Sequence, residues 1–288
     1  MDSLLQRIDN NVKGNVVKVF GLFQNPSAFL NCLRKMPSTE RCMYELILEQ
    51  SPCKAHADIE WIGKAEEGHG RIRKVVRALR EKLLDDFPHH TAEIYVLCGS
   101  RVAENGRFKH SYHVIVGNMV FPTNHDGQMR HFFSSLCVDD DWFYDDKGKK
   151  ECIVDLGIYS RNRSMRAPFC QKLVKGCPPL IRISADPKHD ELVEDYNDLS
   201  SVDDDDMLSM LITTPGPQDT IVVHTEYCDK TRKRKSPGSR EDARPPMKRP
   251  AAPMTSLQKA LTDLLQMHGD HNTRVGSCRT LDSGALQV

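Results

Sequence analysis

Residues 152–166 read CIVDLGIYSRNRSMR, an apolar run that contains one carboxylate and leads directly into three arginines. The β-branched and aromatic side chains of residues 153–159 predict a buried strand. An aspartate inside such a strand, Asp155, is unfavourable unless a cation or a hydrogen-bond network receives it, and a divalent metal ion is one such partner. The arginines beyond the strand suit a planar anion, because a guanidinium group matches two phosphate oxygens at once. The stretch alone leaves open a purely structural pairing of Asp155 with Arg161 or Arg163.

A pair of carboxylates lies upstream, in the stretch CKAHADIEWI at residues 53–62. Its composition predicts a strand, and the two-residue period of a strand places Asp58 and Glu60 on the same face. Two like charges side by side repel unless a divalent ion lies between them, and Mg²⁺ or Mn²⁺ favours carboxylate and water oxygens. A solvent-exposed acidic edge is the alternative. We favour the metal site because Ile59 and Trp61 predict a packed opposite face.

A third segment, RFKHSYHVIV at residues 107–116, also has the alternation of a strand. That alternation places Lys109, Ser111 and His113 on one face, where an ammonium, a hydroxyl and an imidazole form a set of donors for phosphate oxygens. A histidine alone would be interpreted as a core residue, but beside the other two we interpret His113 as functional. Three carboxylates from separate segments can hold two divalent ions, and opposite a triphosphate site they indicate nucleotidyl transfer.

The remaining periodic segments predict the surrounding elements. Residues 1–50 predict an accessory layer, and residues 139–146 an acidic, solvated loop. The helix predicted at 69–87 carries a basic face that we interpret as mainly solvated. Further strands are predicted at 43–48, 93–98, 180–183 (a last edge strand) and 220–224, and further helices at 128–138 and, as two weak helices with Asp203 as a cap, at 186–212.

The formal charge of zero over 288 residues conceals a basic C-terminal tail. From residue 229 onward there are twelve Lys or Arg against six Asp or Glu, so the tail carries about +6 and the rest about −6. Its Pro-rich composition predicts disorder over 229–288, interrupted by a short amphipathic helix near 256–267. The basic tracts at 230–235 and 244–250 suggest nuclear import or contact with a phosphate backbone.

Cysteine usage and hydropathy point to a reduced intracellular compartment. The ten cysteines are isolated, with no C-x-x-C pair, so a disulfide framework is not expected. The chain has no long apolar span, so we expect no membrane segment. Together with the basic tail, these features predict a nuclear protein.

The three segments resemble the motifs of the archaeo-eukaryotic primase superfamily, and within it the eukaryotic primase-polymerase and the herpesvirus and large-DNA-virus primases. The resemblance covers residues 40–185 and is closest in the stretch from Val154 to Arg166. It implies an α+β fold, over residues 1–228, of two α/β modules with a catalytic sheet like that of an RNA-recognition motif. It also implies the site residues. Asp58, Glu60 and Asp155 would hold two Mg²⁺ or Mn²⁺ ions, and the triphosphate would be contacted by Lys109, Ser111, His113, Arg166 and Lys172, with Arg163 as a further candidate.

This resemblance implies a DNA primase or primer-extending polymerase in replication or damage tolerance. Its partners would be template DNA, a primer strand, a dNTP or NTP and, through the tail, replication proteins. Many relatives add a zinc module for primer initiation, but His224, Cys228, His268, His271 and Cys278 lack the spacing of a zinc knuckle. We therefore expect no zinc, and primer extension rather than efficient de novo priming.

Two other function classes stay open from the residues alone. Acidic pairs with a histidine also suit a metal-dependent nuclease, although the cationic set around Lys109 and Arg166 favours triphosphate binding. The chain could also be a non-catalytic DNA-binding or scaffolding module, although the presence of all three carboxylates favours an active site.

Overall fold

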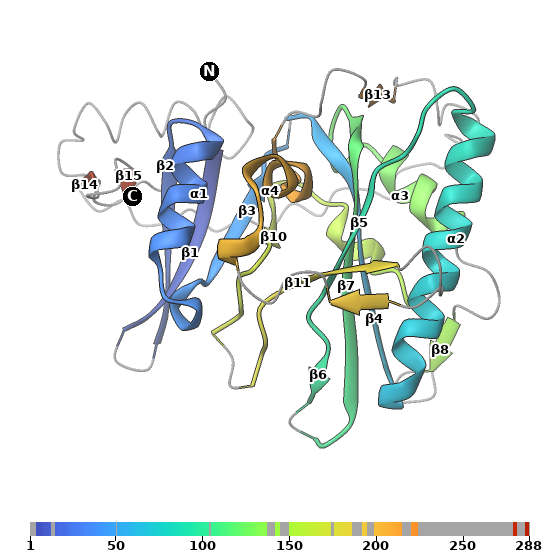
Figure 1. Cartoon of the computed structure of the whole chain (residues 1–288), viewed down its shortest axis with the longest axis horizontal. Helices are drawn as coiled ribbons and strands as arrows, with labels where there is room; N and C mark the ends of the chain where they lie inside the picture. The colour runs from blue at the N-terminus through green and yellow to red at the C-terminus, as the bar shows by residue number, and fades with distance from the viewer. Residues whose placement is uncertain are drawn as a thin grey trace, which may run out of the picture.

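The structure is a computed structural model of the whole chain. It describes residues 4–12, 15–49, 51–103, 105–136, 142–144, 150–173, 176–185, 192–194, 199–214, 220–223, 279–280 and 286–287. These residues form a mixed α+β fold in which two mainly antiparallel sheets lie beside each other (Figure 1).

The larger sheet is built around its longest strand, β7 (Phe108–Phe121). Both edges of β7 are paired, so its backbone groups are satisfied along most of its length. The spatial order is β12, β11, β5, β7 and β13, and β4 and β6 also pair with β7. The other strands are β4 (Cys53–Gly63), β5 (Ile94–Cys98), β6 (Arg101–Val102), β11 (Ile181–Ala185), β12 (Leu192–Glu194) and β13 (Ile221–Val222).

The ladder between β4 and β7 brings the predicted site residues of the two strands opposite each other or next to each other. Asp58 lies opposite His113, Glu60 opposite Ser111, and Ile62 opposite Lys109. Directly paired residues of an antiparallel ladder point to the same face. The predicted strands at 53–62 and 107–116 are thus confirmed, and their polar side chains share one face of the sheet.

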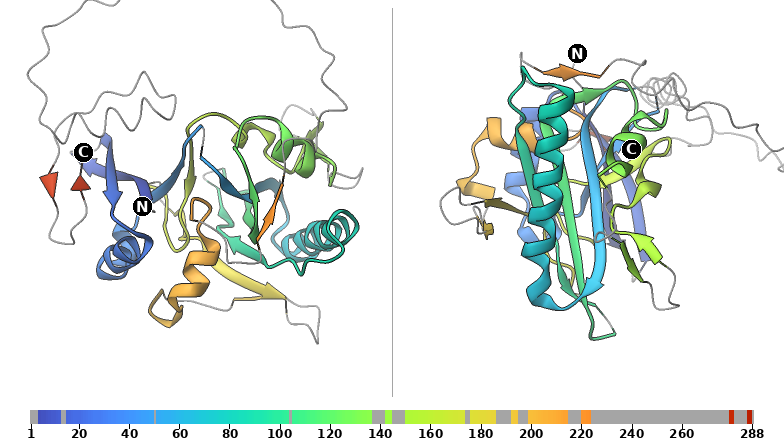
Figure 2. Two further views of the ribbon diagram at one scale, coloured as in Figure 1. Left: turned by 90° about the horizontal axis from the view of Figure 1, so that it is seen from above. Right: turned by 90° about the vertical axis from the view of Figure 1, so that its right-hand side faces the viewer.

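Helix α2 (Gly68–Asp86) covers the opposite face of the larger sheet, along the length of the strands (Figure 2). It buries Ile72, Val75, Val76, Leu79 and Leu83, as the predicted helix at 69–87 requires. Trp61 of β4 stacks on His110 at 4.4 Å, and the Arg71 guanidinium lies 5.4 Å from the centre of the Trp61 ring system. Packing against α2 therefore leaves the face of Asp58 and Glu60 available for a site.

The smaller sheet joins the N-terminal region to a strand at the end of the stretch 152–166. Its order is β10, β3, β1, β2, β15 and β14. Strand β10, which carries Arg166, pairs directly with β3. The N-terminal region, predicted as an accessory layer, is therefore in the same sheet as a predicted site residue. The bounds are β1 (Leu4–Val12), β2 (Asn15–Phe23), β3 (Met43–Ile47), β10 (Arg163–Arg166), β14 (Arg279–Thr280) and β15 (Leu286–Gln287).

Helix α1 (Pro26–Lys35) lies at the flank of the smaller sheet. Its N-cap is Asn25, whose side chain accepts a 2.8 Å hydrogen bond from the backbone N–H of Ala28.

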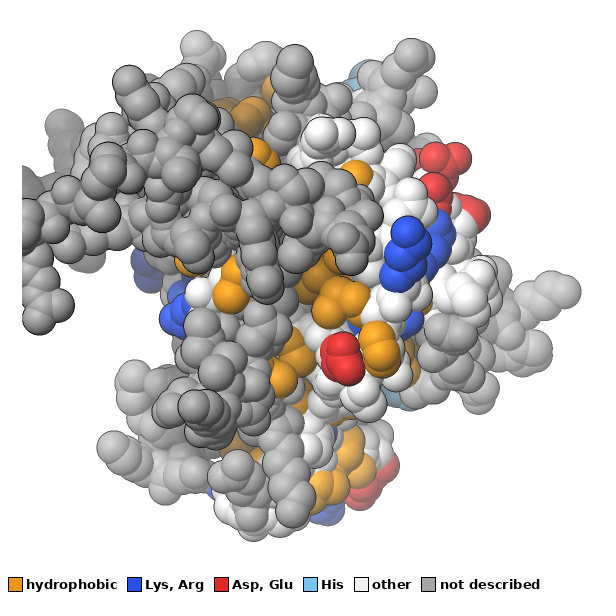
Figure 3. All heavy atoms as spheres, turned by 90° about the vertical axis from the view of Figure 1, so that its left-hand side faces the viewer, with side chains coloured by type: hydrophobic (Ala, Val, Ile, Leu, Met, Phe, Trp, Pro, Cys, Tyr) orange, Lys and Arg blue, Asp and Glu red, His pale blue; other side chains and the backbone are white. Residues whose placement is uncertain are grey.

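On the face seen in Figure 3, described side chains of both charge signs appear with apolar ones between them. The visible part of this face therefore does not favour one charge sign.

Two further helices match predictions in part. Helix α3 (Gln128–Ser134) ends earlier than the predicted 138. Helix α4 (Asp204–Met210) is the second of the two weak helices, and the Asp203 side chain caps it by accepting from the N–H of Asp206 at 2.7 Å. The first weak helix is wrong, because the described residues there form β12 and a 3-10 turn at Leu199–Ser201.

The segment after α4 is tied to β3 and β4 by two buried side chains, Glu45 and Lys54. Lys54 of β4 donates from Nζ to Leu208 O at 2.6 Å and to Thr214 Oγ1 at 3.0 Å. Glu45 of β3 accepts on Oε2 from the backbone N–H of Thr213 at 2.9 Å. Burial lowers the pKa of Lys54 to about 8, and the charge of Glu45 opposes that shift. This network connects both β3 and β4 to the segment after α4.

The predicted buried strand around Asp155 is wrong. The strand β9 (Lys150–Cys152) ends earlier, and only Val154 makes an isolated bridge, to Ile59. Asp155 instead caps the 3-10 helix η4 (Leu156–Ile158), because its Oδ1 accepts the N–H of Gly157 at 2.8 Å. A side-chain bond of this kind competes with strand pairing.

Two other local predictions need correction. The strand predicted at 180–183 is not an edge strand, because β11 lies between β5 and β12. Within the acidic segment predicted as a loop, Trp142–Tyr144 form β8, which pairs with β9.

Six described cysteines form no disulfide: Cys32, Cys42, Cys53, Cys98, Cys170 and Cys177. Cys152 is disulfide-bonded, so the expectation of reduced cysteines is wrong at that position. No helix among the described residues is long and apolar enough to cross a membrane. Most of the predicted basic tail, including the helix at 256–267, lies outside the described residues; the exceptions, β14 and β15, are strands where disorder was predicted.

Candidate functional site

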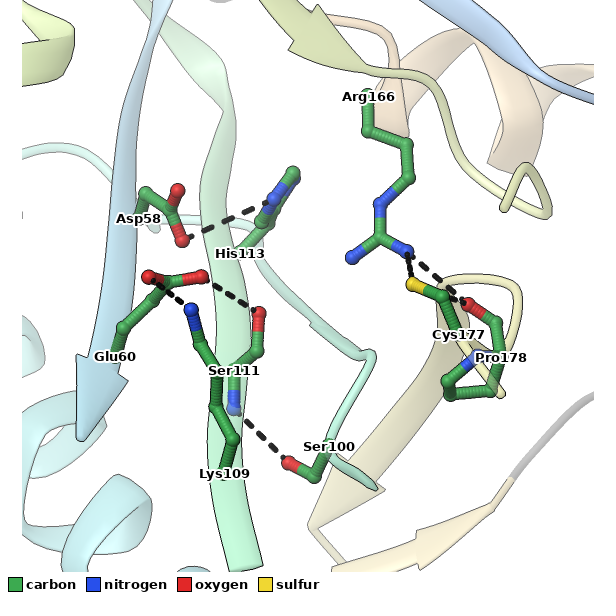
Figure 4. A network of polar contacts seen from close by, with 9 residues as sticks. All are labelled: Asp58, Glu60, Ser100, Lys109, Ser111, His113, Arg166, Cys177 and Pro178. Atoms are coloured by element: carbon green, nitrogen blue, oxygen red, sulfur yellow. Dashed lines mark hydrogen bonds and ion pairs between the residues drawn. The ribbon is translucent and has the colours of Figure 1, made fainter. Parts of the chain in front are cut away.

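The two carboxylates of β4 lie on the face of the larger sheet that α2 leaves open (Figure 4). The side chain of Asp58 is 16 % exposed and that of Glu60 is 27 % exposed. Burial, together with the charges of Glu60 and Asp155, raises the pKa of Asp58 to about 7, although Lys172 and Arg166 oppose the shift. Asp58 Oδ1 is buried and has no hydrogen-bond partner within the described part of the chain. This carboxylate is therefore short of cationic or donor partners.

Glu60, by contrast, is held by two residues of β7. Lys109 Nζ lies 2.7 Å from Glu60 Oε2, and Ser111 Oγ donates to Glu60 Oε1 at 3.3 Å. Both donors come from the same face of β7, as the sequence predicts. Each carboxylate oxygen of Glu60 therefore already has a partner.

His113 faces Asp58 across the ladder. Its Nε2 lies 3.9 Å from Asp58 Oδ1, which is too long for a hydrogen bond, and its Nδ1 has no partner. Burial lowers the pKa of His113 well below its usual value, and the charges of Arg166 and Lys172 lower it further. The imidazole is therefore neutral, and it shares the face of Asp58 although it is only 5 % exposed.

Asp155 reaches the site through the backbone. Its N–H donates to the C=O of Asp58 at 2.8 Å, and the N–H of Glu60 donates to the C=O of Ile153 at 2.8 Å. These two bonds fix residues 153–155 to β4. The charge of Asp155 also raises the pKa of Asp58 and of Tyr159, so the three acidic positions interact electrostatically.

Arg166 lies across from the carboxylates, on β10 (Figure 4). It is 3 % exposed, and its Nη1 donates to Cys177 Sγ at 3.4 Å and to Pro178 O at 3.1 Å. Its Nε and Nη2 are buried, and no described residue accepts a hydrogen bond from either. A Cβ at Gly99 would lie 2.7 Å from Nη2, so the absence of a side chain there makes room for the guanidinium.

Lys172 and Arg163 differ in their relation to this group. The pKa of Lys172 is lowered by burial and by Arg166, and raised by the charges of Glu60 and Asp58, so Lys172 lies within their field. Arg163 is an odd number of positions from Arg166 on β10, which directs the two side chains to opposite faces. No interaction of the described residues joins Arg163 to the carboxylates. The structure therefore gathers every predicted site residue except Arg163.

A metal ion would find carboxylate oxygens here, but not a ready ligand set. Among the described residues, no group of three or more His, Cys, Asp or Glu side chains is arranged to hold a metal ion. Glu60 is bound to Lys109 and Ser111, and Asp155 Oδ1 is bound to the N–H of Gly157. The donor type suits Mg²⁺ or Mn²⁺, and the partnerless Asp58 Oδ1 suits a cation. Binding would require Glu60 to exchange Lys109 for the ion.

Sequence reasoning missed a two-residue segment that supports the site. Gly99 and Ser100 follow β5, and the Ser100 hydroxyl accepts the backbone N–H of Ser111 at 3.1 Å. The N–H of Gly99 in turn donates to Ser111 O at 2.8 Å. A Gly-Ser pair after a strand was the available signal, but it also fits an ordinary turn.

No protein-family model matches this chain, and no curated protein matches it significantly.

Proposed function

We propose that this chain is a template-directed nucleotidyltransferase, a DNA primase or primer-extending DNA polymerase of the archaeo-eukaryotic primase type. One observation carries the proposal. Acidic residues from two segments, Asp58 with Glu60 and Asp155, are linked by backbone hydrogen bonds on one side of a site whose other sides carry Lys109, Lys172 and Arg166. Such a site matches a reaction that brings a polyphosphate to an acidic centre.

In this proposal the carboxylates of Asp58, Glu60 and Asp155 hold divalent ions. When bound, Mg²⁺ or Mn²⁺ would activate the attacking 3′-oxygen and stabilise the leaving pyrophosphate. The raised pKa of Asp58 supports this role, because a carboxylate crowded by Glu60 and Asp155 gains from a nearby cation.

The cationic side of the site would bind the triphosphate. Arg166 has two buried nitrogen atoms without partners, and a phosphate oxygen would satisfy them. Lys109 would transfer from Glu60 to a phosphate once an ion occupies the acidic side. Ser111 and the neutral His113 would add hydrogen bonds, and Lys172 would add charge.

The wider assignment follows from the same proposal. The two sheets would be the two α/β modules of the family, the larger being the catalytic sheet that resembles an RNA-recognition motif. The partners would be primed template DNA and a dNTP or NTP in a nuclear replication or damage-tolerance process, with the basic tail as the contact to replication proteins. Zinc has no part in the proposal.

The test is extension of a labelled primer on a template with dNTPs and Mn²⁺, with an unprimed template alongside. We expect the wild type to lengthen the primer, and Asp58→Asn and Asp155→Asn to lose more than about a hundredfold in rate. Asp85→Asn, an exposed carboxylate on α2, is the matched control and should retain activity.

Two outcomes would overturn the proposal. Shortening of the primer would instead identify a metal-dependent nuclease. DNA binding without any turnover, unchanged in Asp58→Asn, would identify a non-catalytic module.

A further inference from the structure

Strand β6 places its two side chains in the reverse of the usual order. Val102 is 64 % exposed, whereas Arg101 is half-buried. A short strand at a sheet edge normally turns its apolar residue inward and its charge outward. Because Arg101 is paired directly with Lys109 of β7, the two side chains lie on the same face, the face of Glu60 and Ser111. An arginine thus occupies the inward position beside the candidate site.

Among the residues that the structure describes, Arg101 has no carboxylate partner. Two like charges directly opposite each other in a ladder are destabilising. Lys109 is neutralised by Glu60 at 2.7 Å, but Arg101 Nη1 is buried and has no hydrogen-bond partner among the described residues. A buried guanidinium nitrogen without an acceptor is unfavourable by more than the net value of an ordinary hydrogen bond. The arrangement is therefore suited to an anion that Arg101 and Lys109 would share.

The row of polar side chains along β7 indicates which anion Arg101 and Lys109 would share. His113, Ser111 and Lys109 follow one another along β7 away from Asp58, and His113 and Lys109 are about 14 Å apart along the strand. Arg101 lies opposite the outermost of the three. A polyphosphate whose reacting phosphate lies at the carboxylates would extend along this row, and its last phosphate would come nearest to Lys109 and Arg101.

We infer that Arg101 binds the terminal phosphate of the incoming nucleotide and so selects triphosphates over diphosphates. The inference rests on the proposed function, because it assigns a substrate group within the same site. It adds a specificity residue that the three motif segments do not contain.

The test compares binding of fluorescent N-methylanthraniloyl dATP and dADP to the full chain with Mg²⁺ and no template. The wild type should bind the triphosphate at least tenfold more tightly than the diphosphate. Arg101→Gln should lose roughly tenfold in affinity for the triphosphate and stay within twofold for the diphosphate. Arg80→Gln, on the exposed face of α2, is the matched control and should behave as the wild type.

Each other outcome has a separate meaning. If the wild type binds neither nucleotide, the proposed function itself fails. If the wild type discriminates and Arg101→Gln discriminates equally well, only the role of Arg101 is overturned. Weaker binding of a fluorescent primed template with unchanged nucleotide selectivity would also overturn it, in favour of a contact to the strand. Should Arg101→Gln not fold, Arg101→Lys, which keeps the charge but loses the planar fork, should show a smaller loss of about threefold in triphosphate affinity.

Discussion

The backbone N–H of Asp155 donates to the backbone C=O of Asp58 at 2.8 Å. The two acidic segments are therefore joined by main-chain atoms, and neither carboxylate is needed to hold them together. Neutral substitutions of these residues remove charge while leaving the connection intact, which makes the site accessible to simple tests.

Asp58→Asn should stabilise the folded chain at alkaline pH. The pKa of this carboxyl is raised from 3.8 to about 7, so the folded state retains a proton that the unfolded state has released between those values. Folding stability is consequently lost as the pH rises through that window. The substitution should raise the free energy of unfolding by about 1 to 3 kcal/mol at pH 8 and change it little near pH 4.

Urea denaturation of the wild type, Asp58→Asn and Asp85→Asn at both pH values measures this. The Asp85 variant should stay within about 0.5 kcal/mol of the wild type at either pH. A loss of stability in Asp58→Asn at pH 8 would show that the carboxylate is well satisfied in the free protein and is not short of a cation.

His56 should make the chain sensitive to acid. This residue is fully buried, its Nδ1 is 2.8 Å from Lys54 O, and burial lowers its pKa from 6.5 to about 4. The unfolded state gains a proton between those values and the folded state does not, so stability is lost as the pH falls through the window, by up to about 3 kcal/mol. His113 acts in the same direction.

His56→Asn, whose amide can keep the bond to Lys54 O, should show a shallower decline of unfolding free energy between pH 6.5 and 4 than the wild type. The comparison is of slopes, since the smaller side chain lowers stability at every pH. Equal slopes would mean that the pKa of His56 is the same in the folded and unfolded states, contrary to the burial argument.

Gly99→Ala should weaken nucleotide binding through Arg166. The added Cβ would lie 2.7 Å from Arg166 Nη2 and 3.0 Å from Leu180 Cδ2, so the guanidinium must move. We expect a loss of roughly tenfold in affinity for a nucleoside triphosphate. In Gly70→Ala, where a Cβ has no neighbour within 4 Å, binding should be unchanged and the α2 helix stabilised by up to about 1 kcal/mol. If Gly99→Ala and Gly70→Ala bound the nucleotide with equal affinity, Arg166 would not contact the nucleotide.

Lys54→Met should lower the free energy of unfolding of the chain. The substitution removes the bonds from the Lys54 ammonium to Leu208 O and Thr214 Oγ1 and the favourable charge beside buried Glu45, at a cost of about 3 kcal/mol. Lys74→Met, on the exposed face of α2, should change stability by less than about 0.5 kcal/mol. Chemical denaturation measures both, and a neutral Lys54→Met would show that the buried pair is dispensable.

The sequence could predict the strands that carry the site, because polar residues recur at every second position along β4 and in the first part of β7. It thereby predicted that Asp58 and Glu60 share a face, and that Lys109, Ser111 and His113 do. The turn at Asp155 could not be predicted from composition, because apolar residues 153–159 are compatible with a strand and a local bond from Gly157 to the Asp155 side chain decides against it.

The sequence also could not predict the roles of residues that depend on pairing between distant segments. The face of Arg163 follows from β10, which exists only because it pairs with β3 more than a hundred residues earlier. Likewise, nothing in the local composition indicates that Gly99 lies against Arg166 or that Arg101 is paired with Lys109. Such contacts are set by register and not by local propensity.

The most direct measurement is a crystal structure of the chain with Mn²⁺ and a non-hydrolysable dNTP, with manganese located by anomalous scattering. We predict manganese bounded by carboxylate oxygens of Asp58, Glu60 and Asp155, with Lys109 moved from Glu60 to a phosphate and Arg166 on the triphosphate. A bound nucleotide with no manganese between these carboxylates, and with Lys109 still on Glu60, would contradict the proposed nucleotidyl transfer.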